Sequence, residues 1–84
     1  MMMRIELVLT SLAIERNSRL GYALDKFDNN LFFVTSANWE DNAWTVRAET
    51  EISKENERME YHTALTTLER SFPNEKLEVL TPEP

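Results

Sequence analysis

The chain has 84 residues, and its 15 acidic and 9 basic residues give it a formal net charge of −6. A chain of this length forms one small domain, because a second domain could not bury a core of its own. Apolar residues make up 42% and charged residues 29%, which excludes a disordered acidic tail, a collagenous segment and a coiled-coil rod. We therefore expect one folded domain over 1–84, with a frayed tail at 81–84.

The chain contains no cysteine, which excludes a disulfide framework, a thiolate metal site and a thiol nucleophile. The apolar stretch at 5–9 is interrupted by Glu6, and no small-residue cleavage site follows it, so we do not interpret it as a secretory signal. The longest apolar runs, such as 31–34, are far too short to span a membrane. These features predict a soluble cytoplasmic protein.

Acidic residues are concentrated in the later part of the chain. Residues 1–26 carry four bases and three acids, a net charge of +1, whereas the remainder carries five bases and twelve acids, a net charge of −7. A negative field repels phosphate groups, so we expect no direct binding of nucleic acid. The shortness of the apolar runs leads us to expect no membrane partner either. An acidic chain instead favours a partner protein with a basic surface.

Residues 31–52 are predicted to form an antiparallel hairpin. Alternate positions of 43–52 are apolar or β-branched and should share one buried face: Trp44, Val46, Ala48, Thr50 and Ile52. The stretch before them is rich in aromatic and β-branched residues and should form the partner strand. A turn at 40–43 would bring Trp39 and Trp44 together across the hairpin.

The large aromatic residues on this hairpin can either pack in the core or contact a partner. Packing in the core is the simpler one for both tryptophans, because two large rings supply much of the burial in a small domain. The functional reading is that Trp39, at the hairpin tip, is an exposed anchor for a partner. Phe32 and Phe33 are consecutive and must point to opposite faces, so one of them needs a second layer or a partner to cover it.

In residues 54–72 the apolar residues recur with the period of a helix. The recurring apolar residues form one stripe: Tyr61, Ala64, Leu65, Leu68 and Phe72. Ser53 is the expected N-cap, and Pro73 ends the helix because the residue before a proline avoids the α region. A short strand is predicted at 76–80.

The first 27 residues fit two patterns. A strand over about 3–14 is expected from alternating and β-branched residues, and 19–27 form either a second strand or a short helix capped at Asn17 or Ser18. Gly21 would make such a helix about 1 kcal/mol less stable than alanine at the same position. We favour an α+β fold in which one antiparallel β-meander of about four to five strands is covered by the C-terminal helix. The alternative is the split βαββαβ arrangement of ferredoxin-like domains.

Catalytic and metal sites are not indicated by any spacing in the sequence. His62 is the only histidine, and it falls on the predicted helix at a boundary or exposed position without a neighbour to tune it. No calcium loop, zinc spacing or glycine-rich phosphate loop is present. We therefore predict no catalytic residues, no metal and no cofactor.

A cluster of carboxylates at the predicted strand–helix junction is the main candidate for function. With Trp39 as an anchor, its members are Glu49, Glu51, Glu55, Glu57 and Glu60. We predict a small non-enzymatic module, a regulator, adaptor or inhibitor, that docks a basic surface of a partner protein, with mimicry of nucleic acid as a variant. The alternative is a structural subunit or homo-oligomer, such as a homodimer, joined through its sheet.

Overall fold

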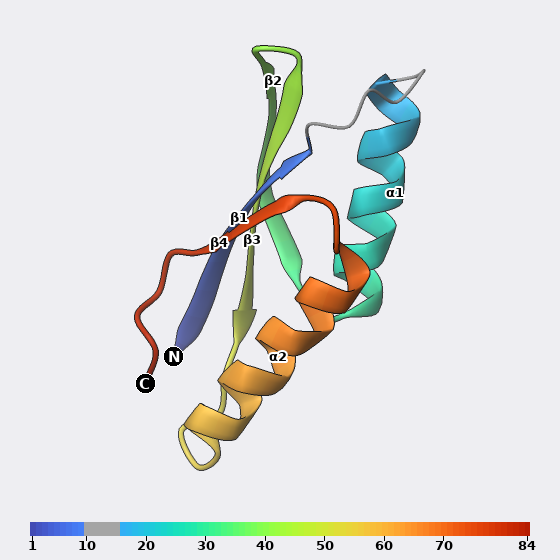
Figure 1. Cartoon of the computed structure of the whole chain (residues 1–84). Coiled ribbons are helices and arrows are strands. Elements are labelled where there is room, and N and C mark those ends of the chain that lie inside the picture. Colours follow the sequence, from blue (N-terminus) through green and yellow to red (C-terminus); the bar gives the residue numbers. More distant parts are fainter. Residues whose placement is uncertain (10–15) are drawn as a thin grey trace.

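The fold of this chain is a four-stranded antiparallel sheet with two helices on one side of it (Figure 1). The computed structural model describes residues 1–9 and 16–84. Its elements, in chain order, are β1 (Met2–Leu9), α1 (Arg16–Asn29), β2 (Phe33–Glu40), β3 (Ala43–Glu51), α2 (Glu57–Ser71) and β4 (Lys76–Val79). The strand order is β2-β3-β1-β4, and all neighbours are antiparallel. The predicted α+β class with one antiparallel sheet is confirmed, in the split βαββαβ arrangement.

The favoured meander is wrong in its treatment of 19–27, which lie in α1 and not in a strand. A strand would have placed Leu20, Tyr22 and Leu24 on one buried face, yet Tyr22 and Leu24 are exposed. The buried residues are instead Ala23 and Phe27, with Leu20 packed against the core, at the spacing of a helix. Burial of this stripe outweighs the cost of a mid-helix glycine. Positions 10–14 of the expected first strand lie outside the described residues.

The hairpin is confirmed in both its strands and its turn. Trp39 pairs with Trp44 and Glu40 pairs with Ala43, which leaves a two-residue loop. Both loop residues, Asp41 and Asn42, have positive φ angles of 52° and 59°. A two-residue loop of this kind is a type I′ turn, whose twist matches that of the flanking strands.

The C-terminal helix is confirmed, but it begins later than its pattern predicted. α2 starts at Glu57 with Asn56 at the N-cap position, so Ser53 is not the cap. The Ser53 N–H instead donates to Glu60 Oε1 at 3.0 Å, which holds the β3–α2 connection against the first turn of the helix. The predicted stripe faces the sheet, with Tyr61, Leu68 and Phe72 buried.

The segment after β4 is held at Thr81, the second residue beyond the strand. The Arg4 N–H donates to Thr81 Oγ1 at 2.8 Å, and the Tyr61 hydroxyl donates to the Thr81 carbonyl oxygen at 3.1 Å. The expectation of a frayed tail over 81–84 therefore does not describe Thr81, which extends the pairing of β4 with β1. No sequence pattern at Thr81 signals these two partners.

Candidate functional site

The residues that the sequence suggested as one partner site lie at opposite ends of the molecule. Trp39 lies beside the hairpin turn, at the end of the sheet where β3 begins. Glu51 lies at the last position of β3, seven residues beyond Trp44 and thus about 24 Å away along the strand. Trp39 is 37% exposed and packs edge-on against Trp44, with ring centroids 5.5 Å apart. These positions do not form a single surface.

The five candidate carboxylates are also divided among themselves. Glu49 pairs with Arg4 at 3.3 Å on the sheet face that points away from the helices. Glu60 is engaged with the Ser53 N–H. Glu55 is exposed in the β3–α2 connection, Glu57 begins α2, and Glu51 lines a groove together with Glu60. The patch is therefore smaller than the sequence suggested, and part of it borders a cavity.

A groove beside α2 arises because the two helices do not run alongside one another. Figure 1 shows α1 over the hairpin end of the sheet and α2 over the other end. Their C-terminal ends meet: the Phe27 and Phe72 ring centroids lie 5.1 Å apart, and Asn30 Nδ2 donates to Ser71 Oγ at 3.2 Å. One flank of the first half of α2 is therefore left uncovered by α1.

This space, which we call the α2 groove, has a volume of about 500 Å³. It is lined by Asn29, Asn30, Leu31, Phe32, Thr50, Glu51, Ile52, Met59, Glu60, Thr63, Ala64 and Thr67. Phe32 and Ile52 are buried in the core, whereas Leu31 and Met59 are 84% and 63% exposed. The lining contains two carboxylates and no cation. Its volume falls within the usual range of ligand pockets, but its lining contains more polar residues than most of them have.

Leu31 occupies an unusual backbone position at the edge of the α2 groove. The Leu31 N–H donates to the Asp28 carbonyl oxygen at 3.0 Å, and the Phe32 N–H donates to the Phe27 carbonyl oxygen at 2.9 Å. This is the Schellman pattern that ends α1, and the neighbouring Phe27 and Phe32 rings, with centroids 6.1 Å apart, supply its usual apolar contact. Its left-handed position is usually glycine, but here it is Leu31 with a φ of 61°.

Sequence reasoning missed the α2 groove. No sequence pattern pointed to Met59, and Leu31 falls within the range predicted for the hairpin. The available signal was the row Met59, Thr63 and Thr67, spaced four residues apart along one flank of α2. Nothing in that spacing indicates that α1 leaves this flank uncovered.

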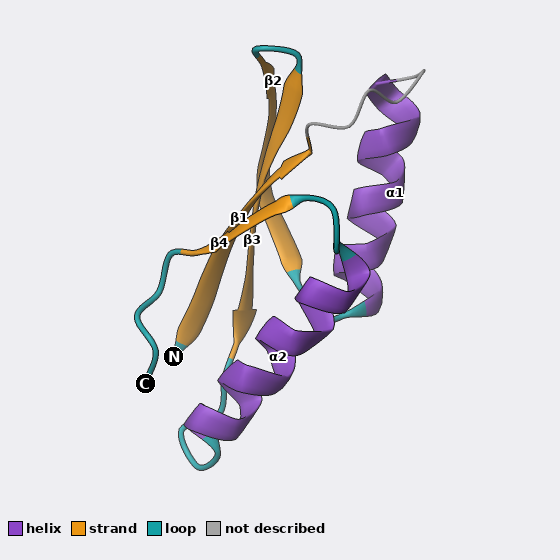
Figure 2. Ribbon diagram, in the orientation of Figure 1, coloured by secondary structure: helices purple, strands orange, loops and turns teal. Residues whose placement is uncertain are grey.

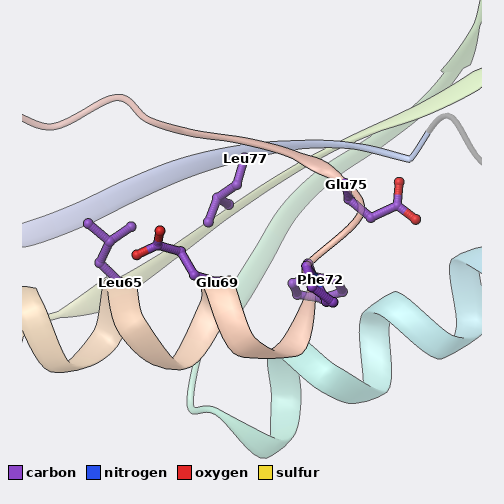
Figure 3. Close-up of a pocket in the computed structure, with 6 residues that line it drawn as sticks. Leu65, Glu69, Phe72, Glu75 and Leu77 are labelled. Atoms are coloured by element: carbon purple, nitrogen blue, oxygen red, sulfur yellow. The ribbon is translucent and has the colours of Figure 1, made fainter.

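A second cavity of about 370 Å³ lies on the other flank of α2, between the helix and β4 (Figure 3). Leu65, Phe72 and Leu77 give it an apolar wall, and Glu69 and Glu75 also line it. Figure 3 shows the two carboxylates on opposite sides of Phe72, so they do not converge on one point. The two carboxylates therefore do not form a close pair of the kind that shares acid and base roles in some active sites.

His62 is exposed on α2, and its Nε2 contacts Glu83 Oε1 in the C-terminal segment. This partner comes from a distant part of the sequence, which no helical spacing could predict. Within 1–9 and 16–84, no group of three or more His, Asp or Glu side chains is placed to hold a metal ion.

Comparisons with protein-family models, with curated protein sequences and with solved structures gave no match. Neither α1 nor α2, as far as the structure describes them, is long and apolar enough to cross a membrane. The α2 groove and the surface of the sheet are the features of the described residues that bear on function.

Proposed function

We propose that this chain is a non-enzymatic protein-binding module whose α2 groove takes a basic segment of a partner protein that carries apolar anchor residues. In this role the chain acts as a regulator, adaptor or inhibitor of its partner, and its lack of cysteine fits a cytoplasmic location. Mimicry of nucleic acid is not favoured, because Glu6 and Glu49 are paired with arginines and do not form a continuous acidic surface.

This proposal rests mainly on Leu31, which combines a left-handed backbone conformation with an exposed side chain. The left-handed conformation costs a non-glycine residue about 1–2 kcal/mol, and the Leu31 side chain recovers little of this because it is 84% exposed. A leucine that weakens the fold and covers nothing within its own chain is understandable as a contact for a partner. Met59, also exposed, lines the same groove from α2.

Charge complementarity determines the kind of partner. The α2 groove is lined by Glu51 and Glu60, with Glu55 and Glu57 in the same junction. Residues 51–60 carry four acids and two bases, a net charge of −2. A partner segment with lysine or arginine beside its apolar anchors would match both the apolar and the acidic parts of the lining, and its approach would be steered by charge.

Replacing Leu31 with glycine should change stability and binding in opposite directions. We expect Leu31→Gly to raise the free energy of unfolding by about 1 kcal/mol in urea denaturation, because glycine adopts a positive φ without strain. The same substitution should remove binding. The probe is a random peptide library displayed on phage and selected on the immobilised original chain only, and the affinity of the selected peptides is then measured for both the original chain and the Leu31→Gly variant. The retained peptides should combine large apolar residues with lysine or arginine.

The control for this experiment is Leu24→Ala, which removes an exposed leucine from α1 outside the lining of the α2 groove. It should leave the affinity for the selected peptides within about twofold of the original. A Leu31→Gly variant that bound these peptides with full affinity would exclude the α2 groove as the site. A loss of stability in that variant would show that the backbone argument is wrong.

Charge reversal near the α2 groove should slow association in a salt-dependent way. Combining Glu51→Lys with Glu55→Lys should lower the association rate of a selected basic peptide by at least about tenfold at low salt. The difference should shrink as ionic strength rises from about 0.01 to about 1 M, because the Debye length falls from about 30 to about 3 Å. Stopped-flow fluorescence measures both rates.

The matched control for charge reversal combines Asp25→Lys with Glu40→Lys. This pair gives the same change in net charge at two exposed positions on α1 and at the end of β2. Equal slowing by both pairs would mean that only net charge matters, and the acidic part of the proposal would then be abandoned.

A further inference from the structure

The sheet face opposite the helices, which we call the outer face, carries an ordered set of charges. Figure 2 shows both helices on the other side of the sheet, and no described helix covers this face. Glu49 on β3 pairs with Arg4 on β1, with Oε2 and Nε 3.3 Å apart. Two residues along, Arg47 on β3 pairs with Glu6 on β1, with Nε and Oε2 3.0 Å apart. Each ion pair forms one row across β1 and β3. The base lies on β1 in one row and on β3 in the other, so the four side chains form a two-by-two checkerboard of alternating charge.

A checkerboard of this kind is complementary to its own copy. When two outer faces meet with their strands aligned, a two-fold axis parallel to the strands and passing between β1 and β3 exchanges the two columns. Arg4 of each copy then faces Glu49 of the other, and Glu6 faces Arg47. If the two sheets cross at right angles, each charge instead faces a like charge. The checkerboard therefore favours aligned packing of the two sheets over orthogonal packing.

Apolar side chains at both ends of one row favour the same axis. Phe33 on edge strand β2 pairs with Glu49, and the Leu80 N–H donates to the Arg4 carbonyl oxygen at the opposite edge. Phe33 is 75% exposed, and Leu80 is exposed as well. The two-fold axis parallel to the strands places Phe33 of one copy over Leu80 of the other. An in-plane axis perpendicular to the strands would leave Phe33 facing Ser36.

Three further pairs of outer positions create no conflict under this axis. They are Ser36 with Glu78, Thr45 with Val8, and Asn38 with Lys76. None of these pairs brings two like charges together. A solvated sheet face needs neither a self-complementary charge pattern nor an exposed phenylalanine.

We propose that the chain forms a homodimer in which two outer faces pack against each other around this two-fold axis. The proposal uses the face opposite the α2 groove and does not depend on the proposed partner. Four strands spaced about 4.8 Å apart and about seven residues long cover roughly 450 Å². This is below the roughly 800 Å² per partner of a standard interface, so the dimer is weak and forms at high protein concentration.

A charge swap between two variants tests the dimer directly. Glu6→Lys makes one row of the checkerboard positive, and Arg47→Glu makes the same row negative. Each variant alone should dimerise at least about tenfold more weakly than the original chain, because like charges then face each other across the interface. An equimolar mixture should restore association, because each row then faces its opposite. Sedimentation velocity from about 10 μM to about 1 mM measures all of these states.

Three further variants control for net charge and for folding. Asp25→Lys and Arg58→Glu make the same charge changes at exposed helix positions and should leave dimerisation unchanged. Phe33→Ser keeps the checkerboard intact and should still weaken dimerisation by about tenfold. Circular dichroism melting verifies that each variant is folded.

Several results would overturn the proposal. An original chain that stays monomeric up to about 1 mM has no such interface. A dimer that is unaffected by either charge variant, or equally affected by the helix controls, is not built on the checkerboard. A mixture of Glu6→Lys and Arg47→Glu that shows no recovery would reject the proposed two-fold axis.

Discussion

Replacing Phe27 with alanine should lower the free energy of unfolding by about 3–5 kcal/mol, the range measured when a buried phenylalanine is truncated. Phe27 is fully buried and lies where three elements meet. Its ring contacts Phe32, just before β2, and Phe72, the C-cap of α2, with centroid distances of 6.1 and 5.1 Å. Domains of this size have a total stability of only about 4–12 kcal/mol. Phe27→Ala should therefore lose a large share of the total stability and unfold at a clearly lower urea concentration than the original chain.

Phe33→Ala is the matched control, because it truncates the same side chain at a position that is 75% exposed. At about 5 μM, where the proposed dimer is dissociated, it should change the free energy of unfolding by no more than about 0.5 kcal/mol. Urea denaturation followed by far-UV circular dichroism measures both variants. Similar losses for Phe27→Ala and Phe33→Ala would contradict the core and the helix layer described above.

The parts of the fold that were predictable depend on contacts between near neighbours in the chain. The alternation along β3 and the single stripe of α2 each fix one buried face. Asp41 and Asn42 tolerate the positive φ angles of a two-residue turn. The segment that became α1 was ambiguous because Leu20, Tyr22 and Leu24 also alternate. Packing against the sheet distinguishes a helix from a strand here, because it buries Phe27 and leaves Tyr22 exposed.

The candidate site was less predictable, because it depends on how far α1 extends over the sheet. The Schellman turn at Leu31 ends the helix before it reaches the flank of α2 that carries Met59. Two exposed apolar residues that are 28 positions apart in the sequence therefore line one groove. Glu49 was assigned to the acidic patch because of its place in the sequence. The register of β1 with β3 places it against Arg4 on the opposite face instead.

The two proposed surfaces are compatible with each other. The α2 groove lies on the helix side of the sheet and the outer face on the other, so a dimer joined through its outer faces leaves two grooves accessible. A partner with two basic segments could occupy both grooves of one dimer. Its second binding event would then be intramolecular, which strengthens attachment without any new contact. A weak dimer would in turn be stabilised by such a partner.

Trp39 either stabilises the fold or acts as an anchor for a partner. The free energy of unfolding of Trp39→Ala distinguishes these two roles. Trp39 is 37% exposed, so most of the ring is covered, and it packs edge-on against Trp44. Burial of about 100 Å² of ring surface and the aromatic pair together predict that Trp39→Ala lowers the free energy of unfolding by about 2–3 kcal/mol.

Trp39→Phe keeps an aromatic contact with Trp44 and should lose less than half of that free energy. Tyr22→Ala is the control for an exposed aromatic residue, and it should cost no more than about 1 kcal/mol. Urea denaturation should be followed by circular dichroism, because removing a tryptophan changes the fluorescence of both states. An anchor that acts only through a partner would give the opposite pattern, with unchanged stability and weaker binding of the selected peptides. We expect the loss of stability, because at 5.5 Å from Trp44 the ring of Trp39 stabilises the end of the hairpin that α2 does not reach.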